Sequence, residues 1–218
     1  ETTIQQLLND GKPLEYARDY IVSGCSLPTV PGLSFDVIGS QFNLPLMLEL
    51  ALNNGKSRIT GEQIGPKTGD PKKIKSYDEV WEAYKKQVEY FIPITVLVKN
   101  FDRQLYAEYL PTPFQSVLFQ SCIDKGQDIT NGGTFPYITD GISLVGAPNV
   151  GDSLAAIKKA VFEDKKIPID RLIDALDKNF EGQDEILNLL KQAPKYGNDD
   201  DYVDSIVKDL FSHFLSAV

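Results

Sequence analysis

The sequence has little of the residue types on which metal sites and acid–base catalysis usually depend. Its 218 residues include one histidine, His213, and two cysteines, Cys25 and Cys122. These cannot build a conventional zinc site, and they exclude most Ser-His-Asp and Cys-His schemes unless His213 lies in the site. We therefore expect no metal ligands. With so few cysteines and no Asn-x-Ser/Thr sequon, we expect a reducing, cytoplasmic location rather than a disulfide framework.

Long hydrophobic runs and an excess of positive charge are missing as well. No apolar run approaches the roughly 18 residues of a membrane span, and no basic-then-apolar leader is present. The chain has 31 acidic and 22 basic residues, for a net charge of −9. Such a chain repels phosphate backbones, so we expect neither nucleic acid nor a membrane as a partner. What is present is 42% hydrophobic residues, enough for a sizeable core.

Helical patterns dominate, and strands are expected to be a minority. The spacing of Leu44, Met47, Leu48 and Ala51 predicts a helix. We expect this helix to stop at 54–55 and the next to begin with a capping box at 76–79 and to kink or end at Pro93. A further helix is expected from Thr112-Pro113 to Gly126. The remaining helices are expected to start at Asp152, Pro168, Asp184 and 198–201. Two irregular stretches, 24–42 and 126–151, are rich in glycine and proline, and function usually lies in such stretches.

Two polar motifs have ordinary structural interpretations. Residues 61–68 resemble a phosphate-binding loop, but Pro66 has no N–H to offer and Glu62 repels phosphate, so we expect a structural turn. The acidic run at 198–201 lacks the glycine and distal glutamate of a calcium loop. We expect it to begin a helix, with Asn198 or Asp199 as the cap.

The two cysteines differ in their surroundings. Cys122 follows Leu118 by four residues on an apolar face, where a free cysteine packs as a small hydrophobe. Cys25 lies between Gly24 and Pro28, in a segment that favours a tight loop able to present sulfur to a cavity. No base lies near it in sequence, which argues against a thiolate nucleophile. Hydrogen-atom abstraction needs no such base, and simple packing stays open as the alternative.

Several blocks, in order along almost the whole chain, resemble the glycyl radical enzymes of the pyruvate formate-lyase superfamily. The blocks are 16–28 (YARDYIVSGCSLP), 65–71 (GPKTGDP) with 76–79 (SYDE), 113–114 (PF), 128–133 (DITNGG), 152–157 (DSLAAI) and 193–200 (APKYGNDD). The resemblance implies an α/β fold in which this chain is a helix-rich part of a ten-stranded barrel. It also implies that Cys25 becomes a thiyl radical that abstracts hydrogen from substrate.

The resemblance further implies which parts are missing from this chain. Residues 1–218 would be a partial pyruvate formate-lyase-like domain without the C-terminal domain that bears the glycyl radical. No bound cofactor is expected, because the radical is protein-based and is installed by a radical-SAM activating enzyme. The chain opens with Glu1, and family members are far longer. We therefore interpret it as an internal fragment that is inactive alone.

Several positions depart from the family pattern. The family's Gly-Cys-Val-Glu-Pro glutamate is replaced by Leu27, and a Trp-His-Asp stretch of the diol-dehydrating members is replaced by Val37, Ile38 and Gly39. Ser26 stands where pyruvate formate-lyase has a second cysteine. These residues indicate a less polar substrate pocket, although Asp36 is a carboxylate whose role the sequence does not define.

The resemblance therefore implies anaerobic, lyase-type cleavage of a C–C or C–heteroatom bond in a small organic substrate. A first alternative is a hydrocarbon-adding enzyme of the alkyl- or benzylsuccinate synthase type, which needs hydrogen abstraction but no proton shuttle. A second is a non-catalytic acidic helical scaffold. The substrate and the oligomeric state, a homodimer among the options, are left open.

Overall fold

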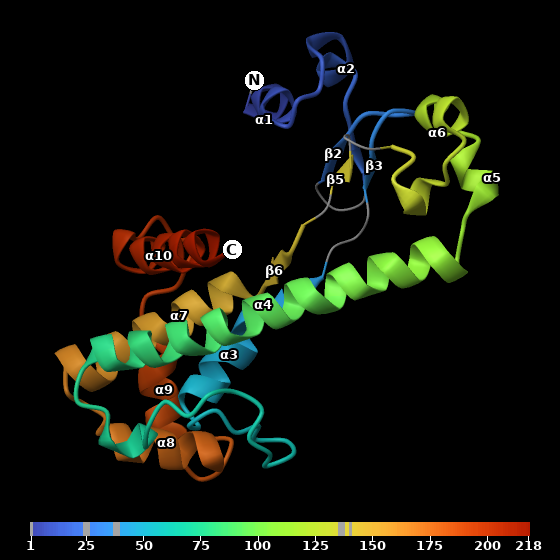
Figure 1. Cartoon of the computed structure of the whole chain (residues 1–218). Coiled ribbons are helices and arrows are strands. Elements are labelled where there is room, and N and C mark those ends of the chain that lie inside the picture. The colour runs from blue at the N-terminus through green and yellow to red at the C-terminus, as the bar shows by residue number, and fades with distance from the viewer. Residues whose placement is uncertain (1, 24–26, 37–39, 135–137, 140) are drawn as a thin grey trace. The chain divides into compact units, whose positions relative to one another are not determined.

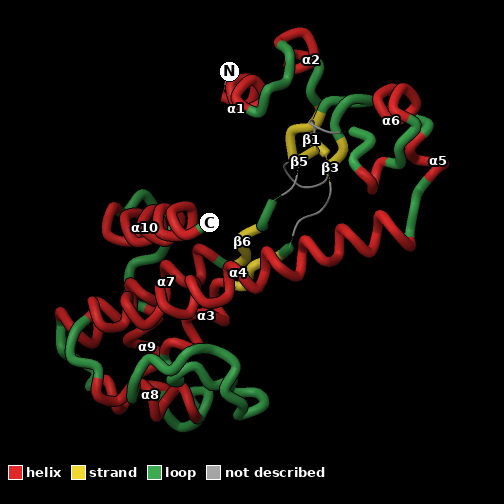
Figure 2. Tube along the Cα trace, in the orientation of Figure 1, coloured by secondary structure: helices red, strands yellow, loops and turns green. Residues whose placement is uncertain are grey.

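The computed structural model describes residues 2–23, 27–36, 40–134, 138–139 and 141–218. The chain divides into two compact units: unit 1 is Glu1–Ser40 with Val96–Ser143, and unit 2 is Gln41–Thr95 with Leu144–Val218 (Figure 1). Helices outweigh short strands throughout the described part (Figure 2), so the expected helix-rich α/β character is confirmed. Within that part, no helix is long and apolar enough to cross a bilayer.

Unit 2 is built around helix α7 (Ala147–Ile157), which continues as a π-helical segment, η3 (Lys158–Glu163). Seven of its eleven residues are buried, as expected for a helix packed on several sides. Helix α10 (Asp201–Ala217) packs along α7, and its buried residues are Val203, Ile206, Val207, Leu210 and Phe214. Gly151 of α7 lies so close to Val207 that a Cβ at residue 151 would overlap the Val207 side chain.

The remaining elements of unit 2 surround α7. They are β4 (Gln41–Asn43), α3 (Leu44–Ala51), η1 (Pro71–Lys73), the first part of α4 (Tyr77–Tyr109), most of β6 (Ser143–Val145), α8 (Ile169–Asp177) and α9 (Asp184–Lys191). Asn43 caps α3 by accepting a hydrogen bond from the Leu46 N–H at 3.1 Å. Two ion pairs, Lys72–Asp174 at 2.5 Å and Arg58–Asp177, attach the segment before α4 to α8.

Unit 1 contains short elements and the second part of α4. They are α1 (Thr2–Asn9), α2 (Leu14–Arg18), β1 (Ile21–Ser23), β2 (Leu27–Thr29), β3 (Phe35–Asp36), α5 (Pro113–Ser116), α6 (Gln120–Lys125), η2 (Ile129–Asn131) and β5 (Ile138–Thr139). Strands β1 and β2 pair antiparallel, and β3 and β5 pair parallel. The described part thus holds two-stranded sheets only, and the ten-stranded barrel stays a prediction, as does the assignment of 1–218 to one partial domain.

Pro93 does not end α4, which runs on to Tyr109, because one proline removes only one helical hydrogen bond and the rest of the ladder persists. A kink at Pro93 stays a prediction. Two other expectations about helices were wrong. Residues 117–119 interrupt the helix expected from Thr112 to Gly126. Asp152 is not a cap, since α7 already begins at Ala147 with a proline in its first turn.

Candidate active site

The candidate site is centred on the hairpin formed by β1 and β2. Ile21 lies opposite Thr29, and Ser23 lies opposite Leu27, so the ladder reaches the residues next to the connecting segment 24–26. Cys25, the predicted thiyl residue, falls in that segment, outside the described residues. Leu27 is described and half-buried. The structure therefore places an apolar side chain next along the chain to Ser26, at the position where the family pattern has a glutamate.

A buried pair of hydroxyls fixes the turn that follows the hairpin. Thr29 and Ser34 are 8% and 4% exposed, and their hydroxyl oxygens are 2.9 Å apart. Ser34 Oγ also accepts the Val30 N–H at 2.7 Å. Between them, Pro31 is followed by Gly32 at φ +71°, which is the Pro-Gly signature of a type II turn. These contacts set where β3 begins, and sequence reasoning did not identify Thr29 or Ser34.

Strands β3 and β5 lie over a hundred residues apart in sequence but pair directly. Phe35 lies opposite Ile138, and Asp36 lies opposite Thr139. The predicted pocket residues Val37 and Ile38 follow β3 and lie outside the described residues. For Asp36 the backbone pairing is established, and the idea that its carboxylate replaces the missing glutamate stays untested. The pairing brings the irregular stretches around 24–42 and 126–151 together in unit 1.

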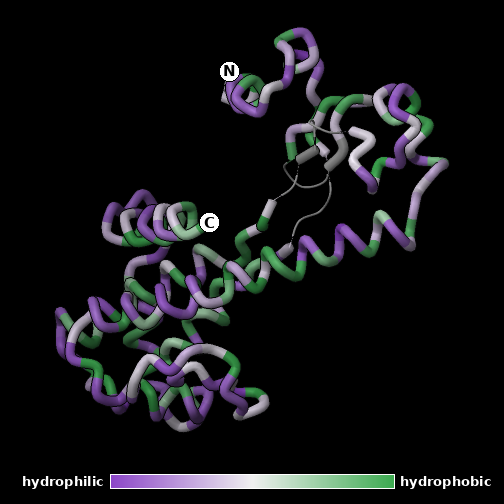
Figure 3. The backbone as a smooth tube through the Cα atoms, in the orientation of Figure 1, coloured by the Kyte–Doolittle hydropathy of each residue, from purple (hydrophilic) through white to green (hydrophobic). Residues whose placement is uncertain are grey.

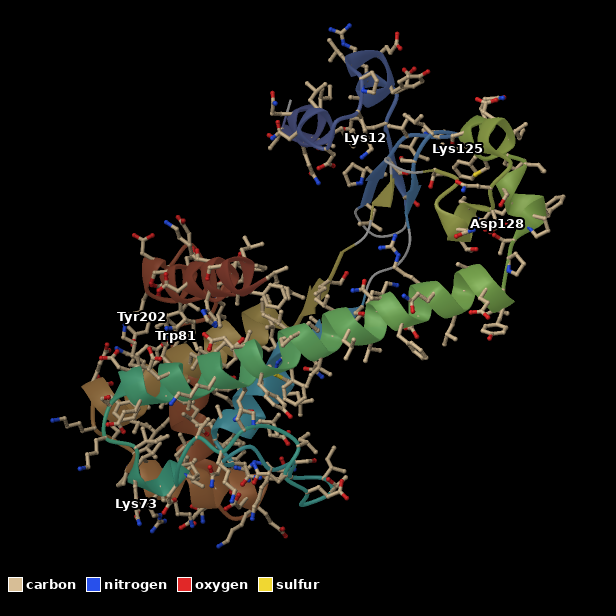
Figure 4. All side chains as sticks on the ribbon, viewed as in Figure 1. Lys12, Lys73, Trp81, Lys125, Asp128 and Tyr202 are labelled. Atoms are coloured by element: carbon tan, nitrogen blue, oxygen red, sulfur yellow. The ribbon has the colours of Figure 1, made fainter. Side chains whose placement is uncertain are left out.

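Asp128 organises the turn that leads toward β5. Its carboxylate accepts hydrogen bonds from the Thr112 N–H at 2.9 Å, the Ser116 hydroxyl at 2.8 Å, and the N–H and hydroxyl of Thr130 at 2.9 and 2.7 Å (Figure 4). Partial burial would raise the pKa of Asp128, but these hydrogen bonds outweigh it and lower the pKa to about 2. The carboxylate is thus ionised and fully engaged, which suits a structural anchor better than an acid or base.

Cys122 occupies a packed position beside the same turn. Its side chain is 3% exposed, and a Cβ on Gly133 would overlap its sulfur. Burial raises the pKa of the Cys122 thiol, so the reactive thiolate is disfavoured. The prediction that Cys122 serves in packing is confirmed.

Residues 61–68 form a structural turn, as predicted, within the loop at residues 53–70. Gly55 O accepts the N–H groups of Ile64 and Gly65, and the Asn54 side chain accepts those of Thr68 and Gly69 at 2.9 Å. The fully buried Gln87 donates to Pro66 O at 2.8 Å. The backbone donors that would cradle a phosphate are therefore used within the protein.

Unit 2 contains a pocket of about 490 Å³ that includes none of the predicted site residues. Its lining is mostly apolar, from α3, α7, α8 and α9. Two carboxylates at its edge already have partners: Glu49 accepts the Arg58 N–H at 3.1 Å, and Asp152 accepts the Tyr196 N–H at 2.7 Å.

The other motifs also have structural roles. Asp200, rather than Asn198 or Asp199, caps α10 by accepting the Tyr202 N–H at 3.0 Å. His213 packs edge-on against Trp81 with Nε2 3.7 Å from Glu89, and burial lowers its pKa. Among the described residues, no group of three or more His, Cys, Asp or Glu side chains is arranged to hold a metal ion.

Comparison with known proteins gives a consistent result along the whole chain. A family model described as pyruvate formate lyase-like matches residues 1–218. The chain is 42% identical to a trans-4-hydroxy-L-proline dehydratase of Clostridioides difficile, over 100% of this chain and 28% of that protein. It is 41% identical to an isethionate sulfite-lyase of Bilophila wadsworthia, over 96% of this chain and 26% of that protein.

Solved structures agree with these matches. The hydroxyproline dehydratase of C. difficile, solved with trans-4-hydroxy-L-proline bound, superimposes with a TM-score of 0.90 at 42% identity, over 99% of this chain and 27% of that one. The B12-independent glycerol dehydratase of Clostridium butyricum, solved with glycerol bound, gives 0.87 at 39% identity, with the same coverage. The chain thus spans about a quarter of the length of the proteins it matches.

Proposed function

The chain belongs to the pyruvate formate lyase-like family of glycyl radical enzymes, and we propose that it is the segment that supplies the hydrogen-abstracting cysteine, Cys25. The main support is that the match covers residues 1–218 and so includes the β1–β2 hairpin on either side of that residue. The related dehydratase and sulfite-lyase both cleave a bond in a small organic molecule. We propose the same broad chemistry for the complete protein.

In the proposed mechanism, Cys25 performs each hydrogen transfer. Its S–H bond breaks as the hydrogen atom passes to the glycyl radical, which leaves a thiyl radical on Sγ. Sγ then takes a hydrogen atom from a substrate C–H bond, and the substrate radical loses its leaving group. The product radical finally regains a hydrogen atom from the Cys25 S–H, and the thiyl radical that results would take its hydrogen atom back from the glycine. The glycyl radical would lie outside these 218 residues, and a radical-SAM enzyme would install it.

The scaffold around the hairpin suits this role. Radical chemistry needs a cysteine held in one place and shielded from water and oxygen. The ladder between β1 and β2 pairs Ser23 with Leu27, the residues on either side of the segment that contains Cys25, and the Thr29–Ser34 contacts hold the far end of β2. We propose that these short strands belong to the ten-stranded barrel of the complete protein. We further propose that this protein acts in the cytoplasm, as a monomer or homodimer.

Leu27 favours a second candidate reaction, the addition of a hydrocarbon to an unsaturated acid. This reaction needs hydrogen abstraction but no carboxylate to move protons, and Leu27 replaces the glutamate expected of a dehydratase. The half-buried leucine also gives an apolar surface that a hydrocarbon would favour. Lyase-type cleavage stays the first proposal because the relatives include a dehydratase and a sulfite-lyase.

The two cysteines provide a matched test of the role of Cys25. In the complete protein, activated anaerobically, Cys25→Ala should abolish turnover and leave the glycyl radical signal in electron paramagnetic resonance intact. Cys122→Ala should keep turnover in the folded fraction, because its thiol is buried and only packs. Turnover that survives Cys25→Ala would support the non-catalytic scaffold instead.

The substrate class is tested by a panel of compounds. Anaerobic assays should compare a hydroxylated amino acid, a hydroxysulfonate and a diol with a hydrocarbon plus fumarate. Leu27→Glu should raise activity toward the first group and lower it toward the hydrocarbon. If the wild-type protein acts on neither group, both candidate reactions are wrong.

A further inference from the structure

The second half of α4, which belongs to unit 1, has a stripe of exposed apolar side chains. Leu97, Val98, Phe101, Leu105 and Tyr109 follow one another at helical spacing, so they share one face. They are 69%, 53%, 58%, 37% and 66% exposed. From Val96 to Tyr109, no residue of the helix is buried, and Figure 3 shows hydrophobic residues recurring along this half. We call these five residues the α4 stripe.

The opposite face of this half is the more buried one, although it has two basic residues. Lys99, Arg103 and Ala107 lie there, and all three are half-buried. A helix at the surface of a finished domain turns its polar face to water and its apolar face to the core. Here the arrangement is reversed. The face with basic residues is half-buried, and the apolar face is exposed to solvent. Five large exposed side chains in one row mark an interaction surface rather than scattered exposure.

Charge at the edges of the α4 stripe indicates what covers it. Asp102 and Glu108 border the stripe, and both are exposed. The bases of this half, Lys99 and Arg103, lie on the other face and already interact with other groups. A second copy docked stripe to stripe would therefore bring acids together and supply no base. The partner that fits has apolar side chains flanked by Lys or Arg.

The lengths of the relatives indicate where that partner comes from. The solved chains that match this one with TM-scores of 0.90 and 0.87 are covered over only 27% of their length. Most of each such protein therefore lies outside the matched segment. We propose that the α4 stripe is an intramolecular docking face, covered by an apolar segment of the same polypeptide from outside these 218 residues that has basic residues at its borders. It is not a dimer interface.

Cysteine labelling in the complete protein tests this proposal. Phe101→Cys should react with a maleimide at least about 100-fold more slowly in the native protein than after denaturation. Mass spectrometry of the peptide that contains residue 101 measures labelling at that residue separately from labelling at Cys25 and Cys122. The slowing of the maleimide reaction at residue 101 should be the same at every protein concentration. If Phe101→Cys does not fold, Leu97→Cys takes its place.

A charge reversal adds a control. Glu108→Lys should raise the native labelling rate at residue 101, whereas Glu181→Lys, an exposed acid of unit 2, should not. Rapid labelling of the native Phe101→Cys variant at that residue, or protection that grows with protein concentration, would overturn the proposal, the latter in favour of a second copy. Neither measurement uses activation or turnover, so the result is independent of the role proposed for Cys25.

Discussion

Unit 2 and unit 1 are stabilised in different ways. Among the described residues, unit 1 has five buried apolar side chains, Leu7, Ala17, Val30, Cys122 and Ile129, whereas every other one belongs to unit 2. Unit 1 relies instead on hydrogen bonds, those of Asp128 and of the Thr29–Ser34 pair above all. Among the described residues, the unit that includes the proposed catalytic cysteine is therefore the one with fewer buried apolar side chains. Regions with few buried apolar contacts open at lower free energy.

The largest expected effect comes from the core of unit 2. Leu154 of α7 and Leu7 of α1 are both 0% exposed, so truncating each to alanine makes a matched pair. Leu154→Ala should lower the free energy of unfolding of unit 2 by about 3–5 kcal/mol, because its cavity lies among packed helices that cannot collapse. Hydrogen exchange should then accelerate across α7 and α10. Leu7→Ala should accelerate exchange only in unit 1.

If either substitution accelerated hydrogen exchange equally in both units, the proposed difference between unit 1 and unit 2 would be contradicted. The two units would then unfold as one cooperative body, and the small core of unit 1 would have no separate consequence. Both variants should be measured under the same conditions, so that each serves as the control for the other.

A second, smaller effect is expected where α7 crosses α10. Gly151→Ala places a methyl group against Val207, and overpacking of this kind costs about 1–3 kcal/mol. Denaturant unfolding should show the loss. In the Val207→Ala background the added methyl has room, so the same substitution should cost much less. If the losses of unfolding free energy from the two substitutions were additive in the double variant, the contact between residues 151 and 207 would not be the cause.

A comparable effect in unit 1 should come from a hydrogen-bonded acid. Asp128→Ala removes the acceptor of four hydrogen bonds and should destabilise the turn before β5 by about 2 kcal/mol. Asp124→Ala is the control, since Asp124 accepts only from Gln120 on its own helix and should change little. Exchange of the Thr112 and Thr130 amides reports the effect locally.

Asp128 also predicts an acid dependence. Its pKa falls from an ordinary 3.8 to about 2 in the folded chain. The unfolded chain therefore binds its proton first, and the stabilisation is complete above about pH 4 and lost as the pH falls through 2. Asp128→Asn should remove this part of the acid transition. An unchanged transition in that variant would assign the acid sensitivity to other carboxylates.

The sequence predicted local structure well where local chemistry determines it. The apolar spacing of α3 and the acidic start of α9 are examples, as is the stop at Gly126, which has φ +61°. It predicted less well where tertiary packing decides, as at Pro93, which α4 accommodates without ending. The cap of α10 moved from Asn198 or Asp199 to Asp200, because neighbouring acids are equivalent in sequence but only one faces the helix N–H groups.

The candidate site was predictable in part. The order of short motifs pointed to the family, which the comparisons show, because each motif is contiguous in sequence; the role of Cys25 stays a prediction. The pairing of Phe35 with Ile138 was out of reach, since nothing local specifies a strand partner a hundred residues away. Ser116 and Thr112 were missed as partners of Asp128 for the same reason. The one available signal was Asp128 two residues before Thr130, a common arrangement in which an acid caps the following turn.

The smallest expected effect concerns His213, which joins α10 to α4 within unit 2. Its side chain is 14% exposed, and Glu89, Glu82 and Lys85 of α4 face it. Burial lowers the pKa of His213 below 6.5 despite Glu89, so near pH 6 the unfolded chain binds more protons than the folded one. The contribution to stability is therefore complete above 6.5 and declines as the pH falls below it. His213→Gln should narrow the difference in Tm between pH 7 and pH 5. A wider difference would mean that the protonated ring is held by Glu89, and that this edge of unit 2 depends on charge rather than on packing against Trp81.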